Sequence, residues 1–139
     1  MALSKLRSLK AAEIPAVLAS SFFLIAAEIQ IRFSSSEKIL KDLQTSKTPS
    51  SFLKSFCPLR TTRVVSLVEA VDRNLGWKPS CLRRTLALAR LSRALGWSPE
   101  IKIGVDRRDG NFRAHSWLEV DGLRLEMDDE AAGYSVLSQ

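Results

Sequence analysis

Three residues in the second half of the chain have side chains that could act together as a thiol nucleophile, its base and an orienting acid. Cys81 is one of two cysteines, His115 is the only histidine, and Asp128 follows that histidine in the same half of the chain. A carboxylate bound to one imidazole nitrogen fixes the tautomer and leaves the other nitrogen to accept a thiol proton. The sequence therefore supplies a Cys-His-Asp triad if the fold brings these residues together.

Cys81 lies where the sequence predicts the start of a helix. Pro79 disfavours helical backbone just before it, and Ser80 is a favourable N-cap residue. A helix-period apolar stripe follows at Leu82, Leu86, Ala89 and Leu95. Free N–H groups and the positive end of the dipole stabilise a thiolate at such a position, and Arg84 adds positive charge. Position alone leaves a second interpretation open, that of a small buried apolar residue.

Two hairpin turns are predicted around the candidate histidine. Alternating runs at 101–105, 112–120 and 123–128 predict strands, and Asp-Gly pairs at 109–110 and 121–122 predict the turns. If the second turn has two residues, Val120 faces Leu123 and His115 faces Asp128. Opposed residues share a face, with Cβ atoms roughly 5 Å apart. A register shift of one residue would replace Asp128 by Asp129.

The predicted hairpin has a polar face and an apolar face. The polar face carries His115, Trp117, Glu119, Arg124, Glu126 and Asp128, and the apolar face carries Ala114, Ser116, Leu118, Val120, Leu123, Leu125 and Met127. We expect Glu119 and Arg124 to form a cross-strand ion pair. Trp117, and Trp77 before the cysteine, could each wall a substrate groove or pack inside the protein. A lone His115 could simply bond a neighbour, but its coincidence with the cysteine and the aspartate favours a triad.

Three runs of residues carry a resemblance to a known family: Cys81-Leu-Arg-Arg-Thr-Leu-Ala-Leu88, Ile103-Gly-Val105 and Phe112-Arg-Ala-His-Ser-Trp-Leu-Glu-Val-Asp-Gly122. Together they resemble the transglutaminase-like cysteine peptidases of lasso peptide biosynthesis, the leader peptidases, although that family more often has alanine where Ser116 stands. The resemblance covers roughly residues 60–139. It implies a triad of Cys81, His115 and Asp128. It also implies an α+β fold, with a papain-like core in which the cysteine helix packs on a small antiparallel sheet.

The same resemblance implies a function and its partners. The protein would be a bacterial, cytoplasmic hydrolase that needs no cofactor and removes the leader from a lasso precursor peptide before a separate cyclase acts. No strand pattern in the first sixty residues could build a fused winged-helix recognition domain, so we expect leader recognition by a separate protein. Two rival functions remain: acyl transfer to an amine with the same triad, and a non-catalytic scaffold.

Composition narrows the class of protein. With 139 residues the chain suffices for one domain, in which a helical region, 1–60, would pack on the core, 61–139. Two cysteines and one histidine supply neither a disulfide framework nor four zinc ligands, so no metal site is predicted. The net charge of +6 includes Arg83, Arg84, Arg90 and Arg93 on the cysteine helix. They form either the solvent face of that helix or a site for an acidic partner; nothing else indicates nucleic-acid binding.

A long apolar run lies near the N-terminus. Residues 14–27 contain no charge and follow the basic stretch Lys5, Arg7, Lys10. We predict a buried helix that begins near Ile14, because Pro15 suits a first helical turn. A helix facing a membrane or a partner and a signal peptide are the alternatives, although Glu13 and Glu28 bracket the run and no clean cleavage site follows. Membrane association is therefore not expected.

Overall fold

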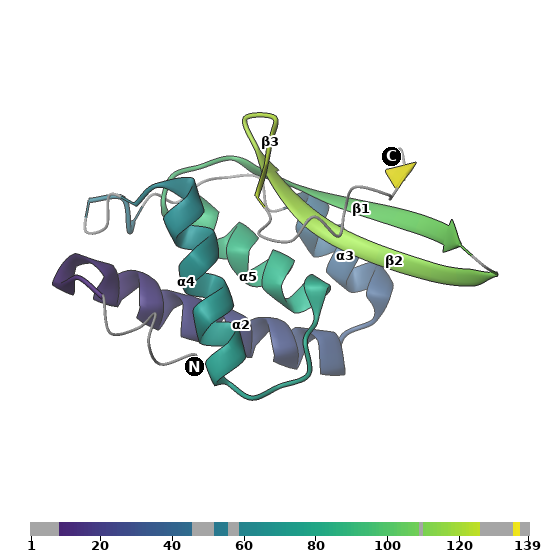
Figure 1. The fold of residues 1–139 in the computed structure, drawn as a ribbon, viewed down its shortest axis with the longest axis horizontal. Coiled ribbons are helices and arrows are strands. Elements are labelled where there is room, and N and C mark those ends of the chain that lie inside the picture. The colour runs from purple at the N-terminus through teal and green to yellow at the C-terminus, as the bar shows by residue number, and fades with distance from the viewer. Residues whose placement is uncertain (1–8, 46–51, 56–58, 109, 126–134, 137–139) are drawn as a thin grey trace.

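The structure, a computed structural model, describes residues 9–45, 52–55, 59–108, 110–125 and 135–136. A short 3₁₀ helix, η1 (Ala11–Glu13), precedes four α-helices: α2 (Ile14–Phe33), α3 (Ser36–Thr45), α4 (Thr61–Asn74) and α5 (Cys81–Ala94). The strands are β1 (Pro99–Arg108), β2 (Asn111–Val120), β3 (Leu123–Leu125) and β4 (Ser135–Val136), in the antiparallel order β3-β2-β1-β4. This combination of helices with a small antiparallel sheet confirms the predicted α+β class (Figure 1).

Helix α5 is the centre of the fold. It contacts β1 and β2 on one side and α2 and α4 on the other (Figure 1). Its buried Leu91 joins a single apolar cluster with Leu24 of α2, Val64 of α4 and Leu118 of β2. Helices from the first half of the chain thus share one core with the sheet, because each has an apolar face that only its neighbours can cover.

The hairpin between β2 and β3 has the predicted register. Asp121 and Gly122 both have positive φ, 52° and 76°, as a two-residue type I′ turn requires. Val120 pairs with Leu123, and Leu118 pairs with Leu125. The predicted continuation, His115 opposite Asp128, lies outside the described residues, as does the neighbouring Asp129.

Helix α2 has two apolar faces of different character. Its inner face is fully buried and consists mostly of small residues: Ala16, Ser20, Leu24 and Ala27. Its outer face carries large exposed side chains, so the predicted buried helix is correct for one face only.

Among the described residues, the stretch 11–33 is the one helix whose length and composition would suffice to cross a membrane. Of its most apolar part, 22% is buried inside the protein.

Candidate active site

Cys81 occupies the first residue of α5, as predicted. The Ser80 hydroxyl accepts a hydrogen bond from the Arg83 backbone N–H at 3.3 Å, and the Ser80 carbonyl accepts one from Arg84 N–H at 3.2 Å. The N–H groups of Cys81 and Leu82 precede Arg84 N–H, which donates the first backbone hydrogen bond of the helix, and are therefore available to an anion at the helix end. The Cys81 thiol is free and half-buried. The other cysteine, Cys57, lies outside the described residues.

His115 lies in the middle of β2, where it pairs with Gly104 of β1. Its half-buried ring stacks on Trp117, with centroids 6.2 Å apart and planes 22° apart. The residue between them, Ser116, points to the opposite face, because side chains alternate along a strand. His115 therefore shares a face with Trp117, and this is not the face on which Ser116 meets α5.

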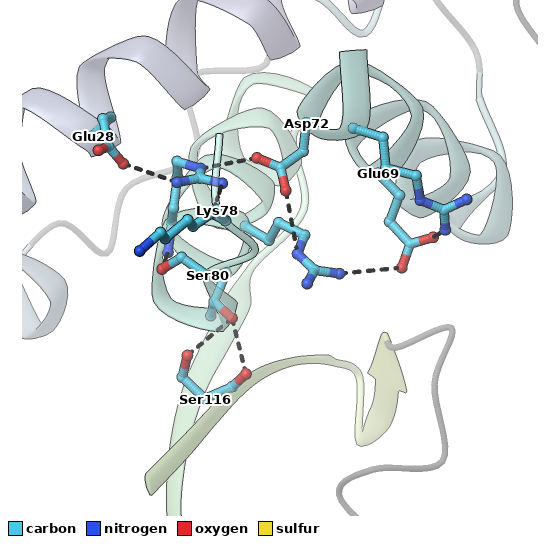
Figure 2. Close-up of polar contacts among 10 residues, drawn as sticks. Glu28, Glu69, Asp72, Lys78, Ser80 and Ser116 are labelled. Carbon is cyan, nitrogen blue, oxygen red and sulfur yellow. Dashed lines mark hydrogen bonds and ion pairs between the residues drawn. The ribbon is translucent and has the colours of Figure 1, made fainter. Parts of the chain in front are cut away.

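A pair of neutral hydrogen bonds ties the cysteine helix to the histidine strand. The Thr85 hydroxyl donates to the Ser116 carbonyl at 3.0 Å, and the Ser116 hydroxyl donates to Thr85 Oγ1 at 3.2 Å (Figure 2). All of these atoms are buried. Thr85 is one helical turn after Cys81, and Ser116 directly follows His115. These two hydrogen bonds thus fix α5 against β2 close to both candidate catalytic residues.

Trp117 is packed inside the protein rather than open to a groove. Its side chain is 1% exposed, and the Arg124 guanidinium lies 4.1 Å from its ring centroid. Its indole N–H donates to Glu119 Oε1 at 3.0 Å. Glu119 and Arg124 face each other across the hairpin as predicted, but each contacts the tryptophan instead of forming the expected ion pair. Trp117 could have walled a substrate groove or packed inside the protein, and its surroundings are those of a packed side chain.

The burial of Arg83 shows that the arginines of α5 do not simply form its solvent face. It is 2% exposed, and its guanidinium donates to Asp72 of α4 at 2.8 Å and Glu28 of α2 at 2.9 Å (Figure 2). A third bond, at 2.8 Å, reaches the Lys78 carbonyl in the loop before Cys81. The guanidinium also lies 5.2 Å from the ring centroid of Trp77. Trp77 is half-buried and is held by this arginine.

Arg83 keeps its charge in spite of burial. Desolvation opposes the charged guanidinium, but the hydrogen bonds that it donates to Asp72 and Glu28 outweigh this effect and raise the pKa of Arg83. The pKa of Glu28 is lowered, first by its hydrogen bond from Arg32 and then by that from Arg83. The buried guanidinium of Arg83 is therefore paired with the buried carboxylate of Asp72 and the half-buried carboxylate of Glu28, and its removal would leave each carboxylate with one cation fewer.

The other helix arginines are also partly enclosed. Arg84 lies within 3.4 Å of Asp72 and 3.9 Å of Glu69, so its charge is matched by α4. Arg90 donates to Gln30 of α2. Burial lowers the pKa of both Arg90 and Arg93. The four arginines of α5 therefore do not form a solvent-facing row, because α2 and α4 cover this side of the helix.

The buried ion-pair cluster is the part of the site that sequence reasoning missed. Its signals were present: Glu28 follows an apolar run at helical spacing from the inner residue Leu24, and Asp72 lies one turn beyond Val68 on the inner face of α4. A carboxylate on an apolar helix face needs a buried cation. Spacing alone groups Arg83 with the other arginines of α5, because it does not reveal which face another helix covers.

A family model described as the Transglutaminase-like superfamily matches residues 23–139, which include α4, α5 and the whole described sheet. The match begins within α2, so part of the helical region belongs to the same matched unit. Neither a curated protein nor a solved structure matches the chain.

Proposed function

Because the chain belongs to the transglutaminase-like superfamily, whose members are typically cysteine proteases or acyltransferases, we propose that it is a leader peptidase of lasso peptide biosynthesis. The observation that carries this proposal is the free thiol of Cys81 at the capped start of a helix, tied one turn later to the strand of His115. The resemblance of residues 112–122 to the lasso enzymes supports the substrate class.

The proposed reaction is proteolysis through an acyl-enzyme. His115 removes the Cys81 proton, and the thiolate attacks the carbonyl carbon at the leader–core junction. The N–H groups of Cys81 and Leu82 stabilise the oxyanion. Protonated His115 gives its proton to the departing amine as the C–N bond breaks, and Asp128 orients the imidazole. Water then hydrolyses the thioester, which releases the leader as a carboxylate and leaves the core amine for the cyclase.

The proposal requires the Cys81 thiol to approach the His115 ring beside β2, because Ser116 rather than His115 faces α5. The pH dependence of Cys81 alkylation by iodoacetamide tests this contact. If the imidazole receives the thiol proton, His115→Ala should raise the apparent pKa of alkylation and slow the reaction at neutral pH. An unchanged alkylation profile would separate the two residues and favour a scaffold.

Delivery of the substrate by a separate recognition protein is part of the proposal. The described residues before α4 form helices and turns and contain no strand that could add to an extended leader. The peptidase would therefore gain most of its affinity for the precursor from a second protein that binds the leader.

A cleavage assay tests the function directly. The protein is incubated with a lasso precursor, with and without the leader-recognition protein, and products are identified by mass spectrometry. We expect cleavage at one junction that depends on the recognition protein and is lost in Cys81→Ala, with Cys57→Ala as the matched control. An added primary amine distinguishes acyl transfer, which would join it to the leader. No product from the wild type would overturn the enzymatic proposal.

A further inference from the structure

Helix α2 carries its largest apolar side chains on the outside. Between Ile14 and Ile31 every exposed residue is isoleucine, leucine or phenylalanine, and a phenylalanine follows at the helix end. We call this row the outer stripe; it consists of Ile14, Leu18, Phe22, Ile25, Ile29 and Phe33. A monomeric protein rarely exposes so continuous an apolar surface. The row therefore marks a contact surface.

The core does not require this arrangement. The inner face of α2 packs on α4 and α5 with mostly small side chains, and the half-buried Glu28 beside this face binds Arg83. An ordinary surface helix would place large apolar residues inward and charges outward. In α2 the size pattern is reversed, and the outward face has no charged residue before Arg32.

The spacing of the outer stripe indicates what covers it. Successive members are 4, 4, 3, 4 and 4 residues apart, so the row reads the same from both ends. Apolar residues spaced by threes and fours suit packing against another helix. An antiparallel copy of α2, related by a twofold axis between Phe22 and Ile25, would set each of these two opposite the other. The remaining members would pair as Leu18 with Ile29 and Ile14 with Phe33.

We propose that the outer stripe binds the same stripe of a second copy of this chain, in an antiparallel α2–α2 dimer. A twofold interface needs a self-complementary surface, in which residue i meets j and j meets i. The outer stripe meets this condition through its symmetric spacing. It also contains no charge that a copy would repel, and the flanking Arg32 is already bonded to Glu28 of its own chain at 2.7 Å.

The available surface agrees with a dimer. Phe22 is 67% exposed and Phe33 is 84% exposed, and the other four members are about half exposed or more. Six such side chains offer on the order of 700 Å² of apolar surface, near the roughly 800 Å² per partner of a stable interface. Beside the stripe lies a hollow of about 450 Å³ lined by residues that include Ile29 and Phe33. Leu18 of the second copy would lie at this hollow.

Light scattering after size-exclusion chromatography tests the dimer. We expect the wild type to have twice the chain mass at tens of micromolar protein, and Phe22→Glu or Ile25→Lys alone to be monomeric. The double variant should recover the dimer, because the acid at 22 of one copy meets the base at 25 of the other. Phe112→Glu is the matched control: this phenylalanine is 68% exposed on β2 and should leave the mass unchanged.

Disulfide capture tests the antiparallel register. In a background with Cys57→Ala and Cys81→Ala, chains carrying Leu18→Cys are mixed with chains carrying Ile29→Cys. We expect efficient cross-linking of the mixture and little of either chain alone.

A wild type that remains monomeric at about 100 μM would overturn the proposal, because even a weak specific interface would form at that concentration. Monomers that float with phosphatidylglycerol vesicles, or a dimer that survives Phe22→Glu, would equally reject it. None of these outcomes depends on peptidase activity.

Discussion

Two sides of the cysteine helix are held by different chemistry. Toward α2 and α4, the polar contacts of α5 are charged, with the buried Arg83 between Asp72 and Glu28. Toward β2, the contacts are neutral, with Thr85 and Ser116 exchanging two hydrogen bonds. Buried charges are costly to leave unpaired, whereas neutral groups cost less. The difference implies that the charged contacts contribute more to stability and make it pH-dependent, while the neutral contacts with β2 set position.

Removal of Arg83 should have the largest effect. Arg83→Ala leaves the carboxylates of Asp72 and Glu28 without their shared cation, and we expect a loss of about 3–5 kcal/mol in the free energy of unfolding. Urea denaturation followed by circular dichroism measures it. Arg73→Ala is the control, because Arg73 binds Glu69 from a side chain that is 57% exposed and should cost less than about 1 kcal/mol. Equal losses in the two variants would mean that the burial of Arg83 does not make its ion pairs more important than an exposed one.

Thr85→Val tests the neutral side. The substitution keeps the shape of the side chain but removes both hydrogen bonds with Ser116, which is buried. We expect a loss of about 1–3 kcal/mol, the usual cost of unsatisfied buried polar groups. The loss should be the same at pH 7 and pH 4, since neither hydroxyl titrates. A loss that changed with pH would show that this contact is coupled to the charged side.

Glu13 provides a pH-dependent test on another ion pair among the helices, the one between η1 and α4. Its carboxylate accepts two hydrogen bonds from Arg63 at 2.6 and 2.8 Å, and chiefly for this reason its pKa is lowered from 4.5 to about 2. A lowered pKa gives stability that is complete above pH 4.5 and is lost as the pH falls toward 2. Glu13→Gln should therefore cost about 1–2 kcal/mol at pH 7, after allowance for the partly exposed Arg63.

The same Glu13→Gln variant should approach the wild type in stability near pH 2, which urea titrations at several pH values would reveal. A constant difference across that range would mean that the hydrogen-bond geometry, and not the carboxylate charge, stabilises this contact.

The smallest effect is expected at the cap of α5. Ser80→Ala removes the hydroxyl that accepts from Arg83 N–H and should cost about 1 kcal/mol. Ser80→Asp should retain the cap, and thermal unfolding of the two variants compares them. If Ser80→Ala is neutral, the buried arginine alone holds this end of the helix.

The elements that position the site could be predicted from local sequence. Pro79 and Ser80 determine where α5 begins, and the Asp121-Gly122 turn determines the register of β2 and β3. These signals work because capping and turn formation depend on a few neighbouring residues. The helix-start position of Cys81 and the mid-strand position of His115 followed from them. The pairing of His115 with Asp128 is an extension of the same register and stays a prediction.

Only the tertiary structure decided which faces are covered. Arg83 lies in sequence among other arginines, yet it is buried because α2 and α4 meet over it and bring Glu28 from 55 residues away. Residues 14–27 of α2 carry no charge on any face, so periodicity could not distinguish the inner face from the outer stripe. Local propensity fixes an element and its register, but burial depends on which distant element packs on which side, and that is a property of the assembled fold.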